Sequence, residues 1–117
     1  MSSCEDANDT AKGGVAIELT GQQRKYLRGL AHGFQPVVWI GKEGLTLNLM
    51  LEVERALEDH ELIKIKFNEF KEEKSLFCEE IVAATGCAQA GMIGHVAIFY
   101  RPRREVNKRR IVLPVKR

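Results

Sequence analysis

A loop bounded by two glycines is the stretch of this sequence whose residue types and spacing could do chemistry. Gly41 and Gly44 enclose Lys42 and Glu43, after an apolar run and before a segment with helical spacing. Glycines let a backbone come close to a phosphate group, and the first N–H groups of a helix can donate hydrogen bonds to it. Lys42 adds a mobile positive charge, so the loop is a candidate site for holding a nucleic-acid backbone.

The position of this loop separates it from a second copy of the same pattern. Gly-x-x-Gly alone is a weak signal, because glycine makes up about 7% of an average protein and chance often produces the spacing. Residues 91–94 also fit, but they lie between two expected strands where no helix begins. KH-type RNA-binding domains clamp nucleic-acid backbone with such a loop. The alternative is a plain strand-to-helix turn whose glycines supply positive φ angles.

The residue types that enzymes use are not grouped in a way that predicts catalysis. No Walker-type loop is present, and no nucleophile-elbow sequence surrounds any serine: Ser2, Ser3 or Ser75. The three histidines fall in separate segments, without ligand-spaced cysteine or acidic partners. We therefore expect no enzyme activity, no metal or other cofactor, and no small-molecule substrate.

Charge is distributed unevenly along the chain. Residues 101–117 carry eight basic side chains and one acidic, a net +7, and residues 19–44 carry a net +3. Residues 1–18 carry a net −3, and residues 45–100 a net −5. A polyanion would therefore be attracted to the first helix, the glycine-bounded loop and the C-terminal tail.

The basic residues outside the loop are open to two interpretations. Arg24, Lys25 and Arg28 share one side of the expected first helix, where they could bind phosphate or simply form a solvated face. Arg103 and Arg104 begin the basic tail, which can add nonspecific affinity for RNA by counterion release even when it has no fixed structure.

Three further residues could contact a nucleic acid, but their patterns favour structural roles. Trp39 precedes the loop and could stack on a base, yet it lies in a β-rich apolar run, so we expect it in the core. Lys64 and Lys66 alternate along one expected strand, and we expect them to cover its solvated side.

Periodicity places the loop between a strand and a helix and predicts the other elements around them. Strands are expected at residues 36–40, 61–67, 87–93 and 96–101, and helices at residues 20–33, 46–60 and 71–85, the first beginning with a Thr20–Gln23 capping box. The order α-β-α-β-α-β-β indicates parallel pairing through right-handed crossovers and a final antiparallel hairpin. The sequence thus predicts a single α/β domain, a mixed four-stranded sheet with three helices packed against it.

Composition divides the chain into three parts and indicates its compartment. We expect a flexible acidic extension at residues 1–18, a folded domain at 19–102 and a basic tail at 103–117. The N-terminus lacks the basic start and apolar run of a signal peptide, and no stretch approaches the roughly 20 apolar residues of a membrane span. A reducing interior is indicated by three scattered cysteines, Cys4, Cys78 and Cys87. We expect a cytoplasmic monomer without a membrane partner.

Several segments, in order, resemble the CRM domain family (chloroplast RNA splicing and ribosome maturation), and within it the stand-alone YhbY-like proteins. The resemblance covers about residues 19–114, and the matching segments are Leu30–His32, Pro36–Thr46, Glu54–Leu57, His60–Lys66 and Ile93–Arg101. Because so many segments match in order, the resemblance is far more specific than a lone loop motif.

The resemblance implies an α/β fold similar to the C-terminal domain of translation initiation factor 3. It also implies RNA binding through the Gly-x-x-Gly loop and neighbouring basic residues. Carried onto this chain, these roles fall on Gly41, Lys42, Glu43 and Gly44 in the loop, on Arg24, Lys25 and Arg28 in the first helix, and on Arg101 at a strand end.

Bacterial and archaeal proteins of this type are single domains linked to precursor large ribosomal subunits, and plant organellar relatives carry the domain in group II intron splicing factors. The resemblance therefore implies ribosomal RNA of the large-subunit precursor as the partner, and assistance in ribosome assembly as the function. Two alternatives stay open. The chain could be a protein-interaction module that uses the acidic region at 45–100, or it could bind a non-ribosomal RNA.

Overall fold

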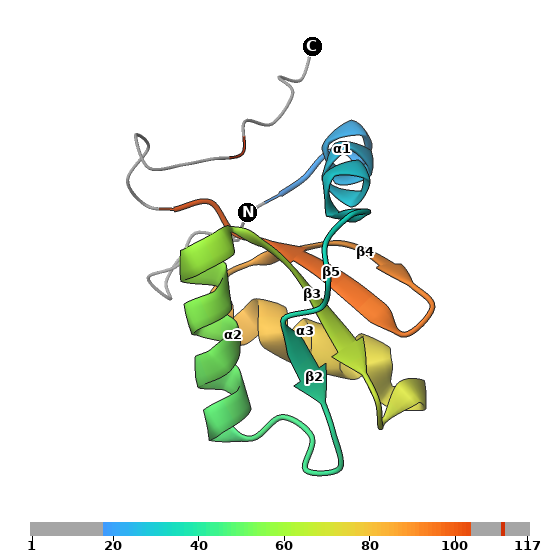
Figure 1. The fold of residues 1–117 in the computed structure, drawn as a ribbon, viewed down its shortest axis with the longest axis vertical. Helices are drawn as coiled ribbons and strands as arrows, with labels where there is room; N and C mark the ends of the chain where they lie inside the picture. The colour runs from blue at the N-terminus through green and yellow to red at the C-terminus, as the bar shows by residue number, and fades with distance from the viewer. Residues whose placement is uncertain (1–17, 104–110, 112–117) are drawn as a thin grey trace, which may run out of the picture.

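The first two helices begin at the capping residues that the sequence predicts. The computed structural model describes residues 18–103 and Ile111 (Figure 1). Its helices are α1 (Gly21–Ala31), α2 (Leu47–His60) and α3 (Lys74–Thr85), with one 3₁₀ turn, η2 (Lys71–Glu73), directly before α3. The Thr20 hydroxyl accepts a hydrogen bond from the Gln23 N–H at 3.0 Å, and the Thr46 hydroxyl accepts one from the Leu49 N–H at 3.1 Å. Both caps satisfy donors that a helix start leaves without a partner.

The four strands form one mixed sheet. They are β2 (Val38–Ile40), β3 (Leu62–Phe67), β4 (Ala88–Ile93) and β5 (Val96–Tyr100), and they lie in the order β2-β3-β5-β4. The β2–β3 pair is parallel, as expected for two strands joined through α2, whereas β5 runs antiparallel to both β3 and β4. The prediction of three helices on a mixed four-stranded sheet is confirmed.

The helices cover the two faces of the sheet unequally. On one face α2 and α3 close the larger core, formed by Val38, Ile40, Val53, Leu57, Ile63, Ile65, Phe67, Cys78, Ile81, Cys87, Ala97 and Phe99. On the other face α1 contributes Leu27 and Ala31 to a smaller cluster with Leu62, Ala90, Ile98 and Tyr100. Alternation along each strand sends neighbouring side chains to opposite faces, so β3 and β5 contribute to both cores.

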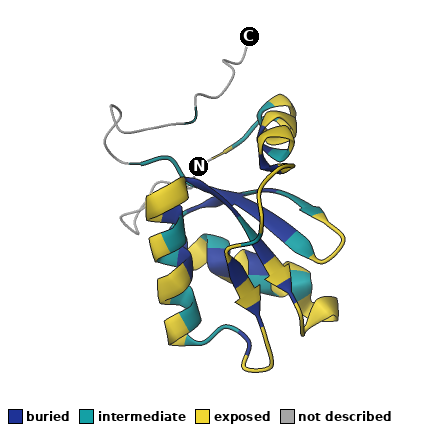
Figure 2. Ribbon diagram, viewed as in Figure 1, coloured by how far each residue is buried: buried dark blue, intermediate teal, exposed yellow. Residues whose placement is uncertain are grey.

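The glycine-bounded loop and α1 lie at opposite ends of the molecule, at the bottom and the top of Figure 1. Figure 2 shows most of this loop, between β2 and α2, as exposed. Within the described residues, no helix combines the length and apolar character needed to cross a membrane.

Candidate nucleic-acid interface

The two glycines of the loop have different roles in the fold. Gly44 is buried and has a φ of 71°, a conformation that residues with a side chain rarely adopt. A Cβ there would also lie 3.5 Å from Cε2 of Phe70. Gly41 has no positive φ, and a Cβ at this position would meet nothing within 4 Å. The fold therefore accounts for the glycine at position 44 but not for the glycine at position 41.

Backbone hydrogen bonds fix the base of the loop and leave its tip in solvent. The carbonyl of Ile40 accepts hydrogen bonds from the two residues that follow β3, at 3.0 Å from Asn68 and 3.2 Å from Glu69. The N–H of Gly44 donates to the carbonyl of Gly41 at 3.0 Å and closes the turn. The two residues between the glycines are exposed. Backbone hydrogen bonds therefore hold the base of the loop in place, and its tip is exposed.

The loop ends two residues before the helix, which is capped by Thr46 as the sequence predicts. Helix α2 begins at Leu47, and Gly44 is separated from it by Leu45 and Thr46. The Thr46 hydroxyl already accepts one of the first N–H groups of the helix. The exposed loop backbone and the Lys42 ammonium group, rather than the start of the helix, are therefore the candidate donors to a phosphate group here.

The basic residues of α1 lie at the other end of the molecule (Figure 1). Arg24 and Lys25 are exposed. Arg28 is half-buried, and its Nη1 donates to the carbonyl of Ala90 at 3.1 Å. Its side chain crosses Gly91, where a Cβ would lie only 2.5 Å from Cδ of Arg28. Gly91, the first glycine of the second Gly-x-x-Gly pattern, thus makes room for Arg28, which holds α1 against β4.

Arg101, the strand-end arginine, is engaged inside the fold. Its guanidinium group forms ion pairs with Glu54 at 2.9 Å and with Glu58 at 3.1 Å, both on α2. The same group donates to the carbonyl of Thr85 at 2.8 Å, at the end of α3. Arg101 therefore joins α2 and the end of α3 to the end of β5.

Arg103 is also engaged inside the fold. Its Nε donates to the carbonyl of Glu58 at 2.9 Å, and its Nη2 donates to the carbonyl of Asp59 at 2.7 Å. These carbonyls belong to the last turn of α2, where a positive charge is favourable. The third C-terminal candidate, Arg104, lies outside the described residues.

A group of lysines surrounds His95, in the turn between β4 and β5. Lys74 Nζ donates to the carbonyl of Gly94 at 2.7 Å and lies 3.1 Å from Nδ1 of His95. The pKa of His95 is lowered, first by partial loss of hydration and then by the positive charges of Lys74, Lys71 and Lys66. These lysines come from three different elements, so no local spacing in the sequence reveals the group.

His95 lies at the same end of the sheet as the glycine-bounded loop. The N–H of Phe67, the last residue of β3, donates to the carbonyl of His95 at 2.8 Å. The next residue, Asn68, donates to the carbonyl of Ile40 on the other side of β3. The lysine group therefore adds positive charge to the end of the molecule that carries Lys42.

Trp39 is not in the core, and the expectation that it packs there is wrong. Its side chain is 51% exposed, whereas Val38 is 1% and Ile40 is 0% exposed. An apolar run predicts a strand buried on both faces, but α2 and α3 cover only one face of β2. Lys66, on the neighbouring strand, is exposed as expected.

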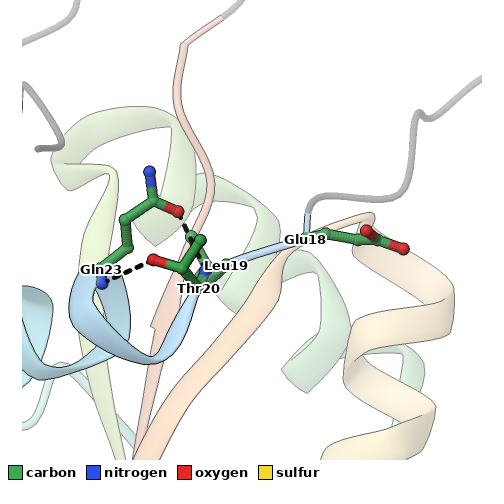
Figure 3. Close-up of a pocket in the computed structure, with 4 residues that line it drawn as sticks. All are labelled: Glu18, Leu19, Thr20 and Gln23. Atoms are coloured by element: carbon green, nitrogen blue, oxygen red, sulfur yellow. Dashed lines mark hydrogen bonds between the residues drawn. The ribbon is translucent and has the colours of Figure 1, made fainter. Parts of the chain in front are cut away.

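A pocket lies beside the start of α1 (Figure 3) and is lined by Glu18, Leu19, Thr20 and Gln23. Two of these residues form the capping box, in which the Gln23 side-chain oxygen also accepts from the Thr20 N–H at 3.0 Å. Nowhere in the described part of the chain do three histidine, cysteine or acidic side chains gather as a metal ion would need.

Comparisons with known proteins agree on the relationship. The chain matches the family described as the CRS1 / YhbY (CRM) domain over residues 19–101. It is 43% identical over 90 residues to an "RNA-binding protein" of Haemophilus influenzae, covering 76% of this chain and 91% of the relative. It is 34% identical over 97 residues to the "Probable RNA-binding protein YqeI" of Bacillus subtilis, covering 82% of this chain and 99% of the relative.

A solved structure has the same fold. The solution structure of a hypothetical protein from Staphylococcus aureus superposes with a TM-score of 0.70 at 36% sequence identity, covering 83% of this chain and all of that one. Sequence and structure therefore agree, and the chain belongs to the CRS1 / YhbY (CRM) domain family.

Proposed function

We propose that this protein binds RNA, and that its target is ribosomal RNA in precursor large ribosomal subunits, whose assembly it assists as a cytoplasmic monomer. Relatives in Haemophilus influenzae and Bacillus subtilis carry names that describe RNA binding. The ribosomal target rests on the resemblance to stand-alone family members. The proposed activity is binding, without catalysis and without a cofactor.

The observation that carries the proposal is the glycine at position 41. An exposed glycine with ordinary backbone angles and open space around its Cα is not required by the fold. A backbone without a side chain, next to the exposed ammonium group of Lys42, suits the close approach of a phosphate group. Glu43 is exposed in the same tip and opposes this charge, so the contact depends on Lys42 and on the loop N–H groups.

Further phosphate contacts come from two basic regions at opposite ends of the molecule (Figure 1). Lys66, Lys71 and Lys74 strengthen the positive field at the loop end, and Arg24, Lys25 and Arg28 form a second basic region on α1. Because the two regions lie at opposite ends of the molecule, an RNA that meets both must extend along it (Figure 1).

The C-terminal arginines serve this interface indirectly. Arg101 and Arg103 hold the chain after β5 against α2, and their guanidinium groups already have protein partners. The net charge of the tail, to which Arg104 belongs, adds a sequence-independent attraction for RNA.

Sedimentation of cell extract on a sucrose gradient tests the proposal. The wild-type protein should migrate with large-subunit precursors at low salt and leave them at high salt. Lys42→Ala should lose most of this migration, whereas Arg55→Ala, which removes the same charge from an exposed position on α2, should keep it. Co-sedimentation that survives nuclease and high salt would point instead to a protein partner. A protein that stays at the top of the gradient at both salt concentrations would rule out the ribosomal target.

A further inference from the structure

The side chain of Trp39 belongs to a row that crosses the whole sheet. Trp39 pairs with Lys66, Lys66 pairs with Val96, and Val96 pairs with Ile93, so one residue comes from each of the four strands. Residues opposite one another in paired strands share a face. We call these four residues the open row. It lies on the α1 side of the sheet, because the adjacent residues Val38 and Ile40 point into the core beneath α2 and α3.

The open row is left uncovered by the rest of the described chain. Trp39 is 51% and Ile93 is 58% exposed, Lys66 is exposed and Val96 is half-buried. Helix α1 packs farther along the same face, on Leu62, Ile98 and Tyr100. Two large apolar side chains, Trp39 and Ile93, are thus exposed to water in the same row as a lysine.

Positive charge borders the open row on both sides. One step along the strands toward α1, the next row contains Lys64, Ile98 and Gly91, and the side chain of Arg28 lies over Gly91. Lys64 Nζ donates to the carbonyl of Phe34 at 3.0 Å, which uses one of the three donors of that ammonium group. In the other direction, β2 ends at Ile40 and leads into the glycine-bounded loop.

We propose that the open row is a stacking platform for unpaired bases of a single-stranded RNA, with Trp39 as its main stacking residue. This inference rests on the proposed function and adds to it the form of RNA that is bound. The indole face stacks on a base, and Ile93 and Val96 extend the apolar surface. Lys66, Lys64 and Arg28 attract the sugar–phosphate backbone on either side of the stacked bases.

The position of the platform accounts for the separation of the two basic regions. The open row lies between the loop end, with Lys42, and α1, with Arg28, so a strand stacked on it would contact both. An RNA duplex hides the faces of its bases, which leaves a single-stranded segment as the matching ligand. A peptide could also cover the apolar side chains, but it would bury the positive charges around them unless it were strongly acidic.

Trp39 is the single tryptophan of the sequence, so tryptophan fluorescence reports on the platform directly. We would titrate the full chain with single-stranded RNA of about 12 nucleotides, within the usual length for single-strand-binding folds. Two control ligands are a duplex of the same sequence and a strand of equal length that lacks its bases. Stacking predicts strong quenching by the single strand and little by either control.

Variants test the same platform through the affinity for a labelled single strand. Trp39→Leu should weaken binding about tenfold, and Trp39→Phe should keep most of the affinity because it retains a ring. Leu51→Ala is the matched control, because Leu51 is similarly exposed, at 55%, on α2. Circular dichroism checks that each variant folds, and the wild-type quenching needs no variant at all.

The outcomes separate this inference from the proposed function. RNA binding that depends on Lys42 but leaves the fluorescence of Trp39 unchanged would overturn the stacking platform alone. Equal quenching by the strand without bases would do the same. If neither single-stranded nor duplex RNA binds the wild-type protein, the proposed function fails and the platform with it. Quenching by an acidic peptide, without quenching by RNA, would assign the open row to a protein partner instead.

Discussion

The two loop glycines respond to different demands, and substitution should separate them. Gly41→Ala should change the free energy of unfolding by less than about 0.5 kcal/mol, because the position is exposed and unstrained. It should still weaken RNA binding, since a methyl group would stand where the phosphate approaches. Gly44→Ala should cost about 1 kcal/mol of stability, because its φ is 71°.

Urea unfolding and titration with labelled RNA, applied to both variants, measure the two effects independently. We expect Gly41→Ala to lose RNA affinity while it keeps the stability of the wild type, and Gly44→Ala to lose stability. If Gly41→Ala bound RNA as tightly as the wild type, the main support for the proposed function would be gone.

The two buried thiols give a prediction about pH. Burial raises the pKa of Cys78 from 9.0 to about 11, with a smaller contribution from Cys87, and burial also raises the pKa of Cys87 to about 11. Between pH 9 and 11 the unfolded chain loses these thiol protons while the folded chain keeps them. Stability from this source is therefore full below pH 9 and falls as the pH rises toward 11.

Urea unfolding midpoints at pH 8 and pH 10 check this direction. The loss of stability between the two pH values should be smaller in the double variant that carries both Cys78→Ala and Cys87→Ala. In a Cys4→Ser background, dithionitrobenzoate should react slowly with the folded protein and fast once urea is added, because only thiolates react. Rapid reaction of both thiols in the folded state would contradict the burial described here.

At the scale of elements, one buried carboxylate connects the start of β3 to the chain that follows β5. Glu61 is 0% exposed and has a φ of 66°. Its carboxylate accepts hydrogen bonds from the N–H of Arg103 at 3.1 Å and from the N–H of Ile111 at 3.2 Å. Its own carbonyl accepts from the N–H of Arg101 at 2.8 Å. Glu61 thus links Arg101, Arg103 and Ile111, which follow β5, to the start of β3.

Glu61→Ala should destabilise the protein by about 1 to 3 kcal/mol, because it leaves the partly buried N–H groups of Arg103 and Ile111 without their carboxylate acceptor. Glu61→Gln keeps one acceptor oxygen and should lose less. A chain that ends after Arg103 should lose part of the same free energy, because Ile111 no longer donates. Urea unfolding of the three variants gives the order, and a truncated chain as stable as the wild type would show that the Ile111 contact contributes nothing.

Sequence patterns predicted the elements well where the signal was local. The Thr20–Gln23 capping box and the alternation of residues 62–67 depend on neighbours within a few positions, and both are present in the structure. The prediction that Trp39 is buried was wrong because an apolar run does not reveal how many faces of a strand are covered. The exposure of Trp39 depends on where α1 packs. This helix covers parts of β3, β4 and β5 and leaves β2 uncovered on the same face of the sheet.

At the scale of the whole molecule, the charges predict a measurable salt dependence. If RNA is contacted through four phosphates, the logarithm of the binding constant should fall with the logarithm of salt concentration with a slope of about −3. Lys42→Ala should reduce the magnitude of this slope by about 0.7, and Arg55→Ala should leave it unchanged. Anisotropy titrations of labelled single-stranded RNA at several salt concentrations give the slopes, and a slope near zero would exclude phosphate contacts as the source of affinity.

The arrangement of the candidate site could be predicted only in part. The sequence predicted Lys42 and the basic residues of α1 as candidate contacts, but their positions at opposite ends of the molecule follow only from the tertiary fold. Pairing of β3 with β5 brings Lys66 near His95, and Lys71 and Lys74 reach it from η2 and α3. Side chains that meet only in the tertiary structure have no characteristic spacing in the sequence, so a sequence pattern cannot predict the group.

The two ends of the described domain meet on one side, and this has a practical consequence. Leu19, before α1, and Ile111 pack against the same small cluster, and Arg103 binds the last turn of α2. The loop lies at the opposite end (Figure 1). The domain can therefore be tethered to a surface, or repeated in tandem within a longer polypeptide, through attachment points that leave its loop pointing outward.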